Sequence, residues 1–141
     1  MIDGSHCNSG DTSRCTQTPV TTMVGTTPQE VAIDEATNTI YVVNQTDNDV
    51  SVIDGTHCYG ADTSGCNQSS PTIAVGGAPQ ALAFTPTDAT LSVANTDDNT
   101  VSVISGNTPI ASILVGAGPR SVGFVLDKNT VFVGNRDDLT V

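Results

Sequence analysis

The chain has 141 residues, of which 37% are hydrophobic, which suffices for one globular domain with a modest core. Fifteen acidic residues stand against four basic ones, so the formal net charge is −11, which disfavours nucleic acid and anionic membranes as partners. The longest apolar runs fall short of the roughly 18 residues that a membrane-spanning helix needs, so we expect no membrane span. The first residues, MIDGSHCNSG, lack a basic segment followed by an apolar one, so we expect no secretory signal in this chain.

One unit is repeated three times along the chain, in residues 2–52, 53–103 and 104–141. The first two copies align without a gap, whereas the third lacks a segment that contains two cysteines. Short runs rich in Val and Ile predict four strands per repeat, of which one set is residues 30–34, 39–44, 49–54 and 71–75, with counterparts in the other copies. The intervening phrases VGTTP and NQTDND supply the Gly, Pro, Asn and Asp that turns require. Because no segment has helical periodicity over ten residues, we predict an all-β chain.

Four short antiparallel strands that recur with each unit are typical of the blades of a β-propeller. The phrases YVVN (41–44), SVAN (92–95) and FVGN (132–135) each follow a VGxxP loop and precede VSV or LTV. This pattern resembles the repeat of the YVTN-family β-propellers, which are related to the NHL and surface-layer propellers. The resemblance covers essentially the whole chain, although Ser92 replaces the aromatic residue in the second copy and the third copy is shorter. It implies a single propeller array over residues 1–141, built from blades of four antiparallel strands.

The array contains about three blades, fewer than the roughly four to eight that close known propeller rings. We therefore expect a partial ring that closes with partner blades, either from the remainder of a longer propeller or from a homo-oligomer. In a head-to-tail oligomer, an outer strand near the start of one chain would complete the last blade of the next chain. The residues expected to take part in this strand exchange are Val20, Thr21, Thr22, Met23, Val24, Leu139, Thr140 and Val141.

The first two units each carry a cysteine loop, at residues 4–18 and 55–70. These loops lack the apolar residues that would hold them, so we predict one disulfide within each, Cys7–Cys15 and Cys58–Cys66. A ring of this size contributes roughly 2.5 kcal/mol. Disulfides imply an oxidising compartment, so we expect an extracellular, cell-surface or periplasmic protein.

Two other interpretations of the cysteine loops concern metal and catalysis. His6 and His57 each precede a cysteine, and zinc accepts such ligands, but the close spacing typical of a zinc ligand pair is absent. A His–Cys nucleophile pair is disfavoured because adjacent side chains on an extended chain point apart.

The VGxxP loops and the acidic turns are expected to share one face of the propeller, with the cysteine loops on the opposite face. Acidic turns provide the oxygen ligands that Ca²⁺ prefers, which makes Ca²⁺ the possible cofactor. Asp and Asn are also the residues that the turns themselves favour, and this structural interpretation ranks first. The candidate turn residues for a cation or another ligand are Asp47, Asp49, Asp97, Asp98, Asp137 and Asp138.

No catalytic motif is present, so we expect a structural and interaction module rather than an enzyme. Its loops would bind a protein or small-molecule ligand on a rigid β scaffold. The alternative is a metal-dependent hydrolase, because propellers related by the resemblance include lactone hydrolases with a metal near the axis. Glu30 is the one residue that fits such a metal position, and its counterparts Ala81 and Ser121 are not metal ligands.

Overall fold

A computed structural model of the chain describes residues 1, 4, 6–13, 15–16, 18–59, 62–67 and 69–141. Parts of both predicted cysteine loops therefore lie outside the described residues: 5, 14 and 17 in the first, and 60, 61 and 68 in the second. The regular secondary structure of the described residues is almost entirely β, as predicted. Its one helical segment is the short 3-10 turn η1 (Leu126–Lys128).

The strands form three antiparallel sheets, which we name blades 1, 2 and 3. Blade 1 contains β1 (Pro28–Asp34), β2 (Thr39–Asn44), β3 (Asp49–Asp54) and β4 (Thr72–Ala74) in sequential order. Blade 2 repeats that order with β5 (Pro79–Thr85), β6 (Thr90–Asn95), β7 (Thr100–Ser105) and β8 (Thr108–Leu114). Blade 3 has two strands, β9 (Pro119–Val125) and β10 (Thr130–Asn135).

Two segments that we expected to take part in strand exchange between chains lie outside the sheets of this single chain, and their exchange with a second chain stays a prediction. Val20–Val24 runs outside any sheet, and Leu139–Val141 makes only an isolated bridge, between Asn135 and Thr140. The physical reason is the same for both, because a strand exists only where a neighbouring strand accepts its hydrogen bonds. The N-terminal segment instead follows the outer edge of blade 1, where the Ser70 hydroxyl donates to the Met23 carbonyl (3.4 Å).

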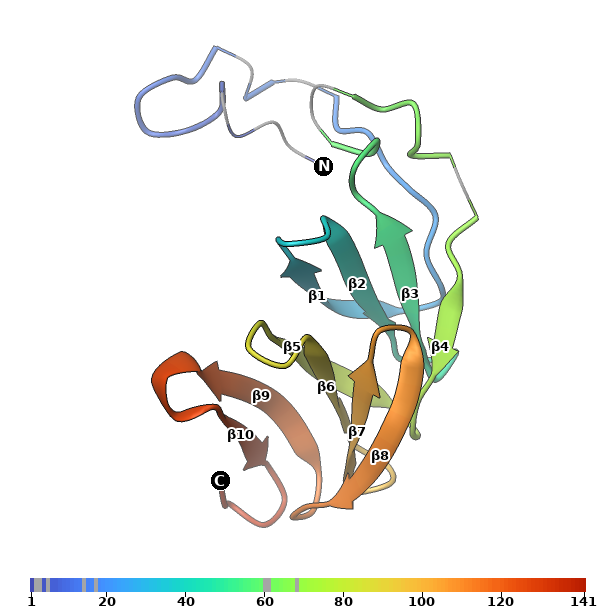
Figure 1. Cartoon of the computed structure of the whole chain (residues 1–141), viewed down its shortest axis with the longest axis vertical. Helices are drawn as coiled ribbons and strands as arrows, with labels where there is room; N and C mark the ends of the chain where they lie inside the picture. The colour runs from blue at the N-terminus through green and yellow to red at the C-terminus, as the bar shows by residue number, and fades with distance from the viewer. Residues whose placement is uncertain (2–3, 5, 14, 17, 60–61, 68) are drawn as a thin grey trace.

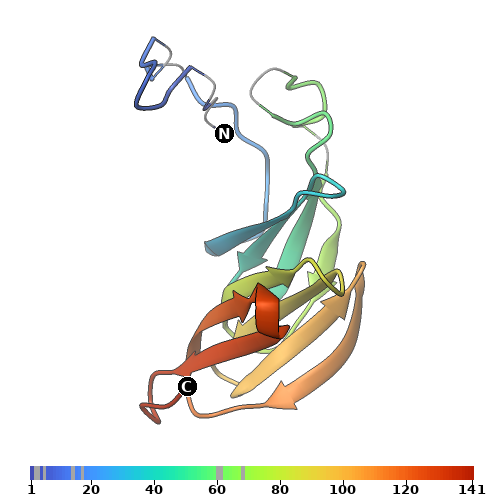
Figure 2. The same ribbon diagram turned by 60° about the vertical axis from the view of Figure 1, so that its left-hand side comes forward.

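The blades are arranged around part of a ring (Figure 1). Their first strands lie closest together, with β1 beside β5 and β5 beside β9. The outer strands diverge, which gives the wedge shape of propeller blades. Figure 2 shows that the three sheets follow one another and that both cysteine loops project from the same end of the array.

The hydrophobic core lies between blades 1 and 2 rather than inside either sheet. Blade 1 contributes Tyr41, Val43, Val50, Val52 and Ile73, and blade 2 contributes Leu82, Leu91, Val93 and Ile104. The Tyr41 and Phe84 rings stack across this boundary, with their centroids 6.1 Å apart. Each blade is therefore stabilised mainly by its neighbour, as in other repeat proteins.

Candidate functional site

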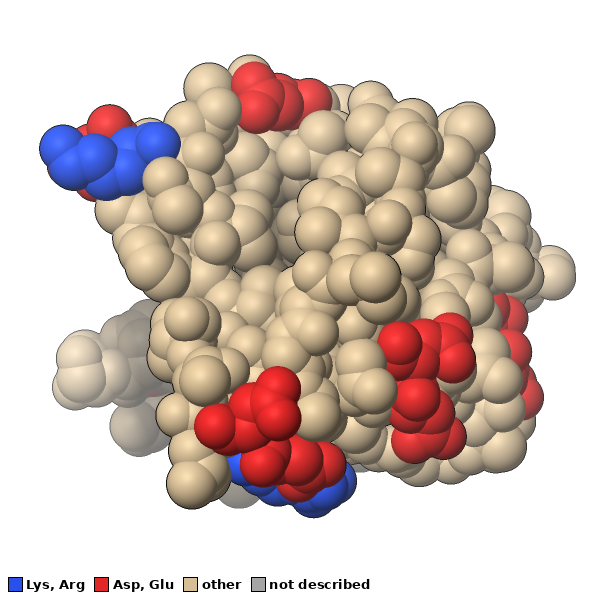
Figure 3. Space-filling model, turned by 90° about the horizontal axis from the view of Figure 1, so that it is seen from below, with Lys and Arg blue, Asp and Glu red and all other residues tan. Residues whose placement is uncertain are grey.

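The face that carries the acidic turns has a repeated internal structure. Figure 3 looks onto this end of the array and shows acidic side chains in separate groups. In each blade, one turn carboxylate accepts a hydrogen bond from the loop that leads into the same blade. Asp47 accepts from the Thr26 amide (2.5 Å), Asp98 from the Gly77 amide (2.6 Å) and Asp138 from the Ala117 amide (2.6 Å).

The asparagine that ends each second strand is buried beneath this turn. Asn44 donates to Asp49 (2.7 Å) and Ser51 (2.8 Å), and the equivalent residue, Asn95, donates to the hydroxyls of its own third strand. The loop glycine packs directly on this amide, because a Cβ at Gly76 would lie 2.6 Å from the Asn95 nitrogen. The VGxxP loop and the Asn of the repeat phrase thus form one structural unit.

In the turns of blades 1 and 2, a second asparagine links the blade to the next one. Asn48 Oδ1 accepts a hydrogen bond from the Ala78 amide (2.8 Å), and Asn99 Oδ1 accepts one from the Gly118 amide (2.9 Å). Both asparagines have a positive φ of 55°, which Asn tolerates better than most residues. We did not predict this role from the sequence, although the recurrence of Asn at matched positions was a signal for it. Blade 3 has Leu139 at this position, also with positive φ.

These contacts give the predicted acidic residues a role in the scaffold. Asp47, Asp98 and Asp138 hold loops, Asp49 accepts from a buried amide, and Asp137 pairs with Arg136 (2.6 Å). Hydrogen bonding by Arg136 lowers the pKa of Asp137. Within the described residues, the Asp97 side chain accepts no hydrogen bond. Ca²⁺ binding by these turns stays a prediction.

Glu30, the predicted metal-ligand candidate, also joins two blades. Its Oε2 atom accepts a hydrogen bond from the Leu82 amide at 2.7 Å. β5 is an edge strand of blade 2, so its outer row of backbone groups has no partner within the sheet. Among the described residues, no group of three or more His, Cys, Asp or Glu side chains has the geometry to hold a metal ion.

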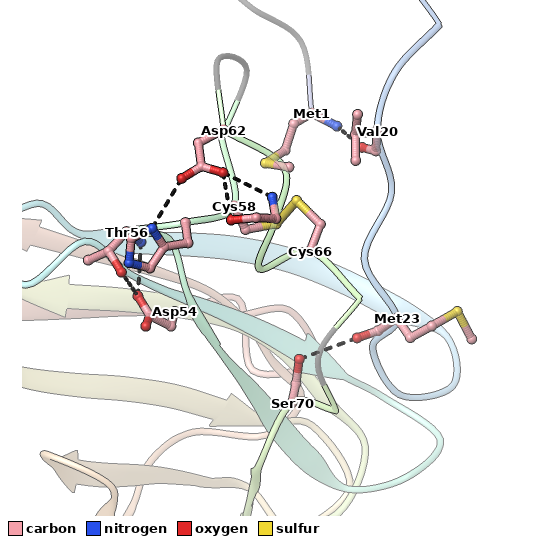
Figure 4. Close-up of a disulfide and its surroundings, with 11 residues drawn as sticks. Met1, Val20, Met23, Asp54, Thr56, Cys58, Asp62, Cys66 and Ser70 are labelled. Carbon is pink, nitrogen blue, oxygen red and sulfur yellow. Dashed lines mark hydrogen bonds and ion pairs between the residues drawn. A yellow bond between two sulfur atoms is a disulfide. The ribbon is translucent and has the colours of Figure 1, made fainter.

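The cysteine loops form the most distinctive surface of the opposite end. Both predicted disulfides are confirmed, with Cα–Cα distances of 4.8 Å for Cys7–Cys15 and 4.7 Å for Cys58–Cys66. Cys58 and Cys66 are buried, so the second disulfide forms a small core within its loop. Figure 4 shows this bond beside Asp62, with Met1 and Val20 of the N-terminal segment nearby.

Asp62 organises the second cysteine loop. Its carboxylate accepts hydrogen bonds from the Ser64 amide (3.0 Å) and hydroxyl (2.7 Å), and it lies 3.1 Å from His57 Nδ1. The backbone of Tyr59 and Asp62 closes the tip through two reciprocal hydrogen bonds (2.8 and 3.2 Å). The Ser64 bonds, followed by the contact with His57, lower the pKa of Asp62 to about 2.

The first cysteine loop has the same frame. His6 Nδ1 lies 3.0 Å from Asp11, the Ser13 amide donates to that carboxylate (2.9 Å), and Asn8 and Asp11 exchange backbone bonds (2.8 and 3.3 Å). The two loops share their His, Cys, Asp, Thr and Ser frame residues but differ at the tip, which reads NSG in residues 8–10 and YGA in residues 59–61. One frame therefore presents two different tips, spaced one repeat apart.

An open hollow of about 570 Å³ lies between blades 1 and 2, on the same end as the cysteine loops. Ile33, Phe84 and Pro86 supply its apolar wall. Its buried carboxylate, Asp34, is already bonded to the Ala36 amide (3.0 Å) and the Thr37 hydroxyl (2.7 Å). The hollow could therefore accommodate an apolar group, but its buried carboxylate already has hydrogen-bond partners.

No protein-family model matches the chain, and no curated protein sequence does either. Its fold is similar to that of a solved enzyme. The match is to hydrazine synthase of Kuenenia stuttgartiensis, with a TM-score of 0.66 and 26% sequence identity. It covers 84% of this chain and 32% of the hydrazine synthase chain, so this chain spans about a third of that protein. The likeness supports the propeller-like architecture.

The disulfides Cys7–Cys15 and Cys58–Cys66 are typical of proteins outside the reducing cytosol. In the part of the chain that the structure describes, no helix has the length and apolar character needed to cross a bilayer.

Proposed function

We propose that the chain is an interaction module of the YVTN-propeller type, secreted or displayed on a cell surface, and that it binds a protein partner through its cysteine loops. The observation that carries this proposal is the shared frame of the two loops combined with their different tips. A loop that served only to connect strands would not need such a frame. Blade 2 makes the same connection with the short turn between β7 and β8, where Gly106 has a positive φ.

The exposed chemistry of the loops fits protein recognition. Tyr59 is half-exposed at the tip of the second loop, and the side chain of His57 is exposed beside it. Tyrosine supplies a large contact area at low cost in conformational entropy, and it is enriched in binding loops. The local disulfide and the Asp62 bonds limit the entropy that the loop loses on binding.

The experiment is site-specific photo-crosslinking in the source cells, with a benzoylphenylalanine probe at position 59. The matched control carries the probe at position 114, where Leu114 is exposed on an outer strand away from the loops. The proposal predicts a discrete crosslinked protein at position 59 that is absent at position 114. Equal crosslinking at the two positions would overturn it.

A loop replacement gives an independent control. Residues 54–71 are exchanged for residues 105–111, the equivalent connection in blade 2, so the scaffold keeps a turn that this chain already forms. The replaced chain should fold and should fail to compete with the wild-type chain for the partner. The hydrolase alternative stays a prediction, and no observation favours it, because Glu30 is bonded to a backbone amide.

A further inference from the structure

The two end blades expose apolar residues whose counterparts in the middle of the array are buried. On blade 1, Val31 and Ile33 are 56% and 54% exposed, whereas Leu82, the equivalent of Val31, is 4% exposed. On blade 3, Phe132 is 50% exposed, whereas Tyr41, its equivalent, is 6% exposed. The difference arises because Leu82 and Tyr41 belong to the core between blades 1 and 2, whereas the strand pairing puts Val31 on the opposite face of blade 1 from Tyr41. Ile33 shares that face and also reaches the rim of the hollow between blades 1 and 2. Phe132 lies on β10, in the last blade of the array (Figure 1).

The alignment of the repeats indicates that the open face of blade 3 matches the open face of blade 1 in the residues it presents. Inside the chain, Tyr41 of one blade stacks on Phe84 of the next. The equivalent of Tyr41 on the open face of blade 3 is Phe132, and the equivalent of Phe84 on the open face of blade 1 is Ile33. The boundary between blades 1 and 2 therefore serves as a template for packing blade 3 of one chain against blade 1 of another.

The blade 1 end and the blade 3 end also differ in net charge. Residues 28–54 of blade 1 contain six acidic and no basic residues, whereas residues 119–141 contain three of each. Arg136 lies at the position of Thr96, whose hydroxyl donates to the Pro119 carbonyl of the following blade (2.7 Å). In a chain of net charge −11, the blade 3 end is thus the surface least repelled by the acidic blade 1 end.

We propose that the open face of blade 3, centred on Phe132, docks on the open face of blade 1, centred on Val31 and Ile33, of a second copy of this chain. The contact is heterologous, because two different faces meet, and on blade 1 it borders the second cysteine loop, since Ile33 lines a shallow hollow together with Cys58 and Tyr59. Heterologous contacts close into rings when the rotation permits. Two copies place about six blades in one ring, within the range that propellers use.

The first test measures the association constant by sedimentation equilibrium, for the wild-type chain, Ile33→Asp, Phe132→Asp and the control Leu114→Asp. Wild type should dimerise. Each face variant should weaken association at least about 30-fold, because it places an unpaired carboxylate in the contact, and the control should match wild type. Circular dichroism checks that each variant folds, and Val31→Asp replaces Ile33→Asp if that variant unfolds.

A mixing experiment distinguishes a heterologous contact from a symmetric one. The Phe132→Asp chain retains an intact blade 1 face, and the Ile33→Asp chain retains an intact blade 3 face. Their equimolar mixture should therefore recover a dimer that neither variant forms alone. No recovery on mixing would overturn the proposal, as would a wild-type chain that stays monomeric into the millimolar range or whose association Ile33→Asp does not change.

A gain-of-function variant tests the register of the contact. Asn48 and Asn99 bond to the following blade, but Leu139 at the same position has no acceptor to offer. Leu139→Asn should supply the missing bond to the Thr27 amide of the second copy and strengthen association about 3- to 10-fold. An unchanged or weaker association constant would contradict the proposed register.

Discussion

Removal of the Asp98 carboxylate tests whether the acidic turns serve the scaffold. Asp98 Oδ2 accepts the Gly77 amide at 2.6 Å and so ties the turn between β6 and β7 to the loop that leads into blade 2. A hydrogen bond to a charged acceptor contributes about 1.5–3 kcal/mol, and exposure to solvent reduces this. We therefore expect Asp98→Ala to lower the free energy of unfolding by about 1 kcal/mol and Tm by about 4 °C.

The neighbouring Asp97→Ala variant is the matched control, because it removes the same charge from the same turn. Its side chain does not make the bond to Gly77, so its effect should stay below about 0.3 kcal/mol. The assay is urea-induced unfolding followed by far-ultraviolet circular dichroism, with EDTA and then with added Ca²⁺. Equal effects of the two variants would refute the structural role. A rise in Tm with Ca²⁺ that Asp97→Ala abolishes would assign the turns to cation binding instead.

Three further predictions follow from buried and loop contacts. In urea melts, Gly76→Ala should lower the free energy of unfolding by about 2 kcal/mol or more, because its Cβ would meet a buried amide at 2.6 Å. The control Gly123→Ala has open space around its Cβ and should change the free energy of unfolding by less than about 0.5 kcal/mol. The Asp62 carboxyl should titrate near pH 2 in ¹³C NMR, because hydrogen bonds lower its pKa. Its contribution to the free energy of unfolding should be present above about pH 4 and lost between pH 4 and 2. A titration midpoint near 3.8 would contradict the loop geometry. Burial and, to a lesser extent, the nearby Asp34 carboxylate raise the pKa of Tyr41 above its ordinary value of 10. The stability that neutral Tyr41 contributes should therefore be lost as the pH rises through this raised pKa, and an absorbance titration that gave Tyr41 its ordinary midpoint would contradict the buried position.

The sequence alone determined the features that depend on short segments. Alternating Val and Ile runs located the strands of blades 1 and 2, because the side-chain period of a strand is a local property. The recurrence of Gly, Pro, Asn and Asp located the turns for a similar reason. The pairing of Cys58 with Cys66 followed from a short, polar loop without the apolar residues that would hold it.

Only the tertiary structure decided which groups meet between blades. Glu30 bonds to Leu82, and Asn48 bonds to Ala78, although the partners are far apart in sequence. These contacts depend on the rotation and distance between neighbouring sheets, which side-chain packing across the boundary sets. No local pattern encodes that geometry, so Glu30 was interpreted as a metal ligand and the turn asparagines as simple turn formers.

The same limit applies to the two segments that we expected to exchange between chains. Val20–Val24 and Leu139–Val141 have the composition of strands, but composition does not supply a neighbour to pair with. The sequence therefore determined which residues are able to join a sheet. Tertiary structure decided which of them do so, because each backbone hydrogen bond in a sheet requires a partner strand at the right distance.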